Sequence, residues 1–252
     1  MLYFALGLFY ALAFILGSVL FSFINVVAYR LPRGENPFRG RSHCTACAHQ
    51  LAPGDLIPVL SYLTLKARCR YCGEKVSPRY LVTEIAGGLL CMLCFMVAEL
   101  PLALFYFAVV CVLATVAIAD WDTQEIPDQC SIALAVLGIA AFFILPDIRW
   151  FERVIGVFVV SVPLLLIALL TGGFGGGDIK LMAAAGLLLG WKHTVLAAFL
   201  GIVIGGIYAI VLLAAKKAGR KTAIAFGPYL CMGILVALLW GGELLGWYLS
   251  KF

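Results

Sequence analysis

Long apolar runs separated by short polar segments dominate the pattern of this chain. The runs lie at roughly 3–27, 81–98, 102–119, 130–146, 153–170, 179–190, 194–214 and 227–249. A helix that spans a bilayer needs about 20 mostly apolar residues, so only the run at 179–190 is short enough to be a half-span. Apolar and polar residues do not alternate along the runs, as they would in the strands of a membrane barrel. The pattern therefore predicts an all-α polytopic membrane protein with seven or eight transmembrane helices.

The overall composition agrees with this pattern. Hydrophobic residues make up 64% of the 252 residues and charged residues only 12%, whereas a soluble domain averages about 25% charged residues. The mean hydropathy is +1.07. These values exclude a soluble globular protein.

The distribution of lysine and arginine predicts the orientation of the spans. With eight spans, residues 28–80, 120–129, 171–178 and 215–226 share one side, and that side holds thirteen of the eighteen basic residues. The opposite side, with both termini, holds Arg149, Arg153, Lys192 and Lys251, and Lys180 lies just inside a predicted helix. Because basic loops stay in the cytoplasm, we expect an inner-membrane protein with its N-terminus outside. The formal charge of +5 then reflects topology and indicates no nucleic-acid partner.

Residues 29–80 form the only polar block long enough to fold outside the bilayer. We expect residues 1–28 to be the first transmembrane helix, residues 29–80 a small cytoplasmic domain, and residues 81–252 a multi-helix membrane domain. The polar block contains two CxxC pairs separated by 21 residues, made by Cys44, Cys47, Cys69 and Cys72.

That cysteine spacing is typical of a structural zinc site with four thiolate ligands. Two disulfides are the alternative, which a reducing cytoplasm disfavours. His43 and His49 flank the first pair, but four cysteines already complete a tetrahedron, so we expect both histidines to lie outside the ligand set. A further pair, Cys91 and Cys94, falls inside a predicted span, where cysteine is usually a small packing residue.

Acidic residues gather at two places that the topology puts on one membrane face. The stretch "DWDTQEIPD" carries Asp120, Asp122 and Asp128, and the glycine run "TGGFGGG" leads into Asp178. An ionisable group at the membrane edge is costly and therefore a functional-site hypothesis. Two carboxylates that converge from separate helices indicate aspartic-protease chemistry. Asp120 and Asp122 point to nearly opposite sides of a helix, so at most one can face Asp178.

Other interpretations of these acids remain open. Asp128 follows Pro127 and could be the N-cap of the next helix, and Asp178 could cap its own helix. Capping alone does not require the preceding glycines, which permit non-helical backbone where it lines a wet cavity. Asp120 and Asp178 could also serve a proton or solute transporter, or the chain could be a zinc-bearing scaffold without catalytic activity.

Five motifs, taken in order, resemble one known family. They are "GSVLFSFINVVAYRLPRGE" (17–35), the two CxxC pairs with the segment 57–85, "DWDTQEIPD" (120–128), "GGGDIKL" (175–181) and "FGPYL" (226–230). Over nearly the whole chain the sequence is similar to the type IV prepilin peptidases, which are G-x-G-D intramembrane aspartic proteases and N-methyltransferases.

The resemblance implies an activity and a set of site residues. It makes Asp120 and Asp178 catalytic, gives supporting roles to Asp122, Asp128, Gly175, Gly177 and Lys180, and assigns Lys66, Arg68 and Glu84 to methyl transfer. The substrates would be prepilins or pseudopilins of pilus, competence or type II secretion systems, each with a hydrophobic N-terminal helix. The enzyme would cut on the cytoplasmic side after the glycine that ends a basic leader, and S-adenosylmethionine would methylate the new N-terminus. A peptidase without methyltransferase activity is the alternative, because Ala67 replaces a glycine that the family links to methyl transfer.

Overall fold

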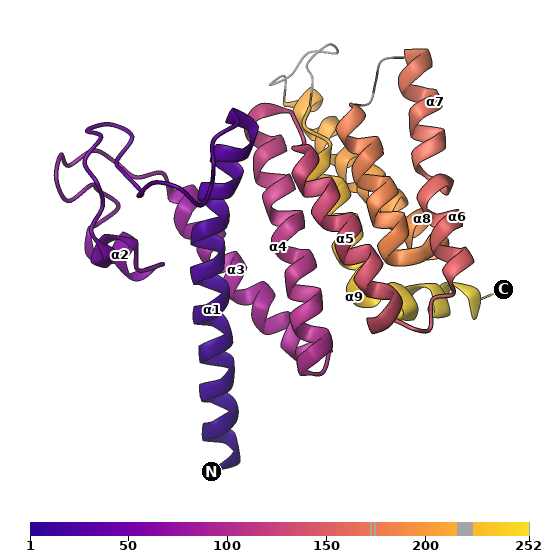
Figure 1. Ribbon diagram of the computed structural model, residues 1–252, viewed down its shortest axis with the longest axis horizontal. Helices are drawn as coiled ribbons and strands as arrows, with labels where there is room; N and C mark the ends of the chain where they lie inside the picture. The colour runs from indigo at the N-terminus through magenta and orange to yellow at the C-terminus, as the bar shows by residue number, and fades with distance from the viewer. Residues whose placement is uncertain (172, 174, 216–223, 252) are drawn as a thin grey trace. The chain divides into compact units, whose positions relative to one another are not determined.

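The computed structural model describes residues 1–171, 173, 175–215 and 224–251. These residues are mostly helical, apart from long loops at 34–52 and 65–77 and shorter connections elsewhere (Figure 1). The helices are α1 (Leu2–Arg30), η1 (Leu31–Arg33), η2 (Pro53–Leu56), α2 (Leu60–Thr64), α3 (Pro78–Val97), α4 (Leu100–Thr123), α5 (Asp128–Ile144), α6 (Trp150–Val159), α7 (Ser161–Thr171), α8 (Gly176–Ala214) and α9 (Gly227–Leu249). The predicted all-α class is confirmed. The basic residues at 216–221, which entered the topology prediction, lie outside the described residues.

The apolar helices agree with the predicted runs. Six helical stretches among the described residues are long and apolar enough to cross a membrane, namely Tyr3–Arg33, Pro78–Val97, Leu100–Thr123, Trp150–Thr171, Gly176–Ala214 and Gly227–Leu249. The 17-residue α5 is apolar but shorter. The chain is therefore a multi-pass membrane protein.

Two compact units divide the chain, Met1–Cys111 and Val112–Phe252, with the boundary inside α4. In the first unit α1 packs closely on α3. The approach occurs at glycines: a Cβ at Gly88 would lie 2.7 Å from the hydroxyl of Ser18, and one at Gly17 would lie 2.7 Å from Cβ of Cys91. Small residues allow such close helix packing within membranes. Cys91 and Cys94 are fully buried here, as expected of packing residues.

In the second unit α8 packs against α5, α6 and α9. Its 39 residues would make a straight helix of about 58 Å, roughly twice the thickness of the hydrocarbon core. Gly190, at φ 72° and ψ 166°, breaks the helix. This break lies at the last residue of the predicted run at 179–190, just before the run at 194–214.

Contacts along α8 show that the chain reverses at Gly190. Gly177, near the start of α8, packs on Ile126, which also packs on the first residue of α9, Gly227. Gly205, in the second half of α8, packs on Tyr229 of the same first turns of α9. The start of α8 and the middle of its second half therefore both lie where α9 begins, and α8 forms two segments (Figure 1).

Candidate active site and metal centre

Asp120 lies in the last turn of α4 and is only 4% exposed. One of its carboxylate oxygens, Oδ2, accepts a hydrogen bond of 2.9 Å from the backbone N–H of Gly227. Gly227 is the first residue of α9, and the first N–H groups of a helix have no partner within it. The start of α9 therefore binds the Asp120 carboxylate, and the helix dipole favours negative charge there.

Asp178 lies in the first turn of α8 and is 8% exposed. Its Oδ2 accepts a hydrogen bond of 3.3 Å from the backbone N–H of Gly175. Gly175 is the N-cap residue and Asp178 is the third residue of the helix, so the Asp178 carboxylate caps its own helix from within the first turn, as the sequence suggested. Asp178 therefore also lies at a helix N-terminus.

The carboxylates of Asp120 and Asp178 interact electrostatically. The backbone that carries them meets at Ile126, in the loop after α4. A Cβ at Gly177 would lie 2.8 Å from Cβ of Ile126, and a Cβ at Gly227 would lie 3.2 Å from Cδ1 of the same side chain. The structure therefore brings the two predicted acids together, from α4 and from α8.

The three glycines directly before Asp178 do not form the non-helical hinge that we expected from the sequence. Gly175 has φ −75°, and Gly176 and Gly177 are already helical, so none of the three needs the conformational freedom of glycine. Gly177 is instead required for its close approach to Ile126. Gly172 in the same run lies outside the described residues.

The other predicted acids point elsewhere. Asp122 is exposed, as its two-residue offset from buried Asp120 predicts. Asp128 is the first residue of α5, whose N-cap is Pro127, so the capping interpretation of Asp128 is wrong. The Asp128 carboxylate instead forms an exposed ion pair with Lys180 of α8, at 2.7 Å.

Four sulfur atoms converge in the first unit. The Sγ atoms of Cys44, Cys47, Cys69 and Cys72 all lie within 4.8 Å of one another, and neither His43 nor His49 belongs to the cluster. A tetrahedral zinc with Zn–S bonds of about 2.3 Å requires sulfurs about 3.8 Å apart. The Sγ atoms of Cys44 and Cys72 are 3.8 Å apart, so the cluster fits a metal ion of this kind.

The two cysteine turns have the same backbone geometry. In each turn the residue after the second cysteine, Ala48 or Gly73, donates its N–H to the carbonyl of the first cysteine, Cys44 or Cys69, at 2.9 and 3.0 Å. Ala48 and Gly73 both have positive φ, 56° and 73°. Hydrogen bonds from the backbone N–H groups at positions 47 and 46 lower the pKa of the Cys44 thiol to about 6. The first turn thus favours the thiolate form that a metal ligand requires. In the second turn, despite a hydrogen bond from the backbone of Glu74, burial and the three neighbouring thiols raise the pKa of Cys72 to about 12.

The residues that the resemblance links to methyl transfer have separate environments. Glu84 of α3 is 8% exposed, and its Oε2 accepts a hydrogen bond of 2.8 Å from the backbone N–H of Val59, just before α2. Lys66 and Arg68 are exposed. Lys66 and Ala67 both have positive φ, 50° and 56°, so the residue that replaces the usual glycine occupies a backbone conformation that glycine favours.

Gly227 and Ile126 both contribute to the paired-acid site, although neither contact could be predicted from the sequence. Gly227 binds Asp120, and Ile126 is the shared packing surface. Gly227 belongs to the "FGPYL" motif, which signalled the family without indicating a contact. Ile126 carries no chemical signal at all.

The fold and the site define a class of protein: a multi-pass helical membrane protein with two buried carboxylates at helix N-termini and a cluster of four cysteines that could hold a metal ion. Two family models match the chain, the bacterial peptidase A24 N-terminal domain over residues 15–98 and the type IV leader peptidase family over residues 107–210.

Relatives extend the match over almost the full length. A prepilin leader peptidase/N-methyltransferase of Bacillus subtilis (strain 168) is 31% identical over 95% of this chain and 98% of its own. A protein of the same name from Pseudomonas putida is 32% identical over 94% of this chain and 92% of its own. No solved structure matches the chain. The chain therefore belongs to the type IV leader peptidase family, and it is an enzyme.

Proposed function

We propose that this protein is an intramembrane aspartic endopeptidase that removes the short basic leader of type IV prepilins or pseudopilins. The observation that carries the proposal is the convergence of Asp120 and Asp178, two buried acids from different helices. The substrate class rests on the names of the relatives, which are prepilin leader peptidases. The three-part domain division predicted from the sequence remains part of the proposal.

The chemistry follows from two carboxylates at close range. Because like charges close together cannot easily both ionise, the pair shares a proton. One acid draws a proton from the attacking water while the other, protonated, polarises the scissile carbonyl. Gly227 fixes the position of Asp120, and Ile126 holds the start of α8 against it. Supporting roles remain proposed for Asp122, Asp128, Gly175, Gly177 and Lys180.

The orientation of the substrate follows from the same arrangement. The basic loops favour a cytoplasmic position for the acids and the cysteine cluster in the inner membrane. A substrate with one hydrophobic helix and a basic leader places its cleavage site at that membrane edge. The oligomeric state of the enzyme does not enter this argument.

A digest of a purified prepilin with purified enzyme tests the proposal. We expect Asp120→Asn and Asp178→Asn each to abolish cleavage, because either change removes one ionisable partner with little change in shape. Glu125→Gln is the matched control, since Glu125 is an exposed acid on the same loop. Normal cleavage by both aspartate variants would refute the protease. Ion flux through wild-type proteoliposomes that both variants abolish would favour a transporter instead.

We further propose that the first unit methylates the new N-terminus and holds zinc. The four-thiolate geometry supports zinc as a structural ion. S-adenosylmethionine would supply the methyl group. Its amino-acid moiety carries a carboxylate and an ammonium, which are complementary in charge to the exposed Lys66 and Arg68 and to Glu84. The names of the relatives include N-methyltransferase.

The mass of the processed pilin N-terminus tests methyl transfer. We expect one added methyl group in the presence of S-adenosylmethionine, and its loss in Lys66→Ala and Arg68→Ala with cleavage retained. If the wild-type enzyme cleaves the prepilin but adds no methyl group, the protein is a peptidase without methyltransferase activity.

A further inference from the structure

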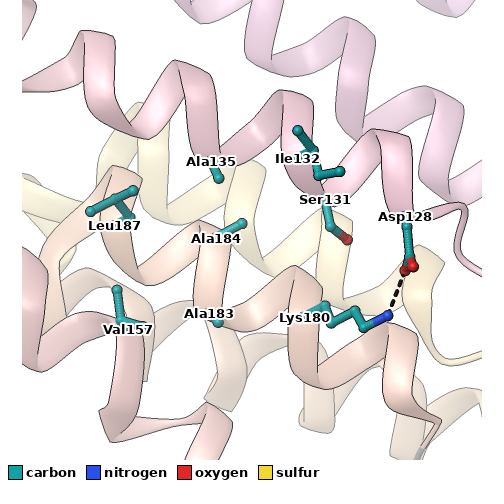
Figure 2. A pocket seen from close by; sticks show the side chains of 9 residues that line it. All are labelled: Asp128, Ser131, Ile132, Ala135, Val157, Lys180, Ala183, Ala184 and Leu187. Atoms are coloured by element: carbon teal, nitrogen blue, oxygen red, sulfur yellow. Dashed lines mark hydrogen bonds and ion pairs between the residues drawn. The ribbon is translucent and has the colours of Figure 1, made fainter.

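A groove of ≈ 450 Å³ lies between α5, α6 and the first segment of α8 in the second unit. Figure 2 shows Asp128 and Lys180 at one end of it, Ser131 and Ile132 beside them, and Leu187 at the other end. Asp178 does not line it, because residues two apart on a helix point to nearly opposite sides. The groove is therefore distinct from the paired acids.

The polarity of the groove changes in order along its length. At one end the ion pair of Asp128 and Lys180 is 62% and 57% exposed. One turn further along α5 comes Ser131, which is 7% exposed and whose buried hydroxyl has no hydrogen-bond partner among the described residues. Beyond it the lining is aliphatic, from Ala135 to Leu187. A partnerless buried hydroxyl is costly, so the groove offers one unused donor between its charged and apolar parts.

The surface around the groove has the character of a lipid-facing surface. Ile132, Val136 and Ile139 of α5 are 63%, 58% and 56% exposed. Their spacing of four and three residues puts them on one face of the helix, and α5 is apolar beyond its first turn. Ile132 also lines the groove. In a multi-pass membrane protein, such an exposed aliphatic face contacts acyl chains.

We propose that this groove binds one glycerophospholipid whose head group carries a primary ammonium, of the phosphatidylethanolamine class. The phosphate binds Lys180, the ammonium binds Asp128, the Ser131 hydroxyl donates to an ester carbonyl, and one acyl chain lies along Ala135 and Leu187. The order of charge, hydrogen-bond donor and apolar lining is the order of groups in the lipid. The ion pair offers both signs of charge, which a zwitterionic head group matches.

Native mass spectrometry of the purified, delipidated full chain with added lipid tests this inference. We expect wild-type protein to bind one phosphatidylethanolamine more tightly than phosphatidylglycerol, which has no ammonium, or phosphatidylcholine, which has no N–H donor. Ala135→Leu fills the groove and should weaken binding at least tenfold. Ala133→Leu is the matched control: Ala133 has a similar half-buried position on α5 but does not line the groove.

Ser131→Ala provides a second test that leaves the groove open. Loss of one neutral hydrogen bond should weaken binding about two- to tenfold. Equal binding by the Ala135→Leu and Ala133→Leu variants, or equal affinity for phosphatidylethanolamine and phosphatidylglycerol, would overturn the inference. Displacement of the lipid by an apolar prepilin peptide would assign the groove to substrate. Cleavage by Asp120 and Asp178 is measured separately, so failure of this inference leaves the proposed function untouched.

Discussion

Arg153 has no exposed surface although it lies in a helical stretch apolar enough to span a membrane. Its guanidinium donates to the carbonyls of Ala141 and Leu145 at the end of α5, both at 2.8 Å, and to those of Leu187 and Leu188 just before the bend of α8, at 3.0 and 2.7 Å. The last carbonyls of a helix have no partner within it and carry partial negative charge. Two helix ends therefore compensate one buried cation.

Replacing Arg153 with leucine should strongly destabilise the second unit. The change removes the guanidinium donor from four carbonyl groups, of which that of Ala141 keeps the N–H of Leu145. The cost is about 1–3 kcal/mol for each buried group left without any partner. We expect the melting temperature in detergent to fall markedly. Arg149→Leu is the control, because Arg149 is exposed at the start of the same helix. Equal melting temperatures for the two variants would contradict this account of Arg153.

Replacing Ala67 with glycine should stabilise the domain that contains it. Its φ of 56° costs an alanine about 1–2 kcal/mol, while glycine raises the entropy of the unfolded chain by about 0.4–1 kcal/mol. We expect glycine to raise the free energy of unfolding by about 0.5–1 kcal/mol. Glycine should keep the same backbone conformation, because the N–H of Ala67 donates to the carbonyl of Tyr62 and the N–H of Val76 donates to the carbonyl of Ala67.

Hydrogen exchange across residues 62–76 measures this gain. We expect Ala67→Gly to slow local exchange about two- to fivefold. Ala52→Gly in the same domain should speed exchange, since Ala52 has an ordinary φ of −73°. Faster exchange in Ala67→Gly would show that alanine is not strained at this position.

At the scale of the helices, the start of α8 is positioned by packing against one side chain. Gly177→Ala would place a Cβ 2.8 Å from Cβ of Ile126 and push Asp178 away from Asp120. We expect prepilin cleavage to fall at least tenfold, because catalysis depends strongly on the geometry of the reacting groups.

The neighbouring glycine supplies the control for this prediction. A Cβ at Gly176 meets nothing within 4 Å, so Gly176→Ala should cleave at the wild-type rate. Ile126→Gly removes the contacting Cβ and should restore part of the activity lost in Gly177→Ala, as expected for two residues in contact. If the double variant loses as much cleavage activity as the two single variants together, this explanation is wrong.

The reversal of α8 depends on a single glycine. Gly190→Ala would force alanine to φ 72° and bring its Cβ to 2.7 Å from Cγ2 of Ile148. The backbone strain alone is worth about 1–3 kcal/mol, so thermal unfolding in detergent should occur at a clearly lower temperature. Gly206→Ala, in open space on the second segment of the same helix, should be neutral or stabilising, since alanine favours helix by about 1 kcal/mol over glycine. If the two variants unfold at the same temperature, the bend does not require glycine.

At the scale of the whole molecule, the two chemical centres belong to different units. All four clustered cysteines lie within Met1–Cys111, whereas Asp120 and Asp178 lie within Val112–Phe252. A metal centre in a small polar domain supplies much of that domain's folding free energy. Damage to it should therefore affect the first unit most.

Metal removal, by a chelator or by Cys47→Ser, tests this separation. We expect methylation of the product and the thermal stability of the first unit to be lost, while prepilin cleavage is retained to a larger extent. Cys94→Ala, which changes a buried cysteine outside the cluster, should leave the metal content unchanged. Equal loss of methylation and cleavage with an intact fold would count against independent centres.

Much of the architecture could be predicted because the bilayer constrains it. Every backbone polar group in a membrane must be satisfied within the chain, so apolar runs become helices. The predicted run at 227–249 and helix α9 coincide. The predicted ends of other runs differ by a few residues, because capping and not hydrophobicity sets them: Ser77 accepts from the N–H of Arg79 to start α3.

The site could be predicted only in part. Asp120 and Asp178 were found because a carboxylate in an apolar chain is conspicuous, and cysteine spacing alone predicted the metal cluster. The local explanation of the glycines was incomplete, because the sequence shows where glycine occurs but not which atoms approach it. Only the packing of Gly177 against Ile126 supplied that reason.

By itself the sequence determined the helical class, the family and the candidate site residues, because hydrophobicity and side-chain chemistry are local properties. The tertiary structure alone decided which of these residues meet. It bound Asp120 to the start of α9, paired Asp128 with Lys180, buried Arg153 between two helix ends and left the hydroxyl of Ser131 facing a groove. Each is a contact between segments far apart in the chain, where packing decides the partner and no local pattern records it.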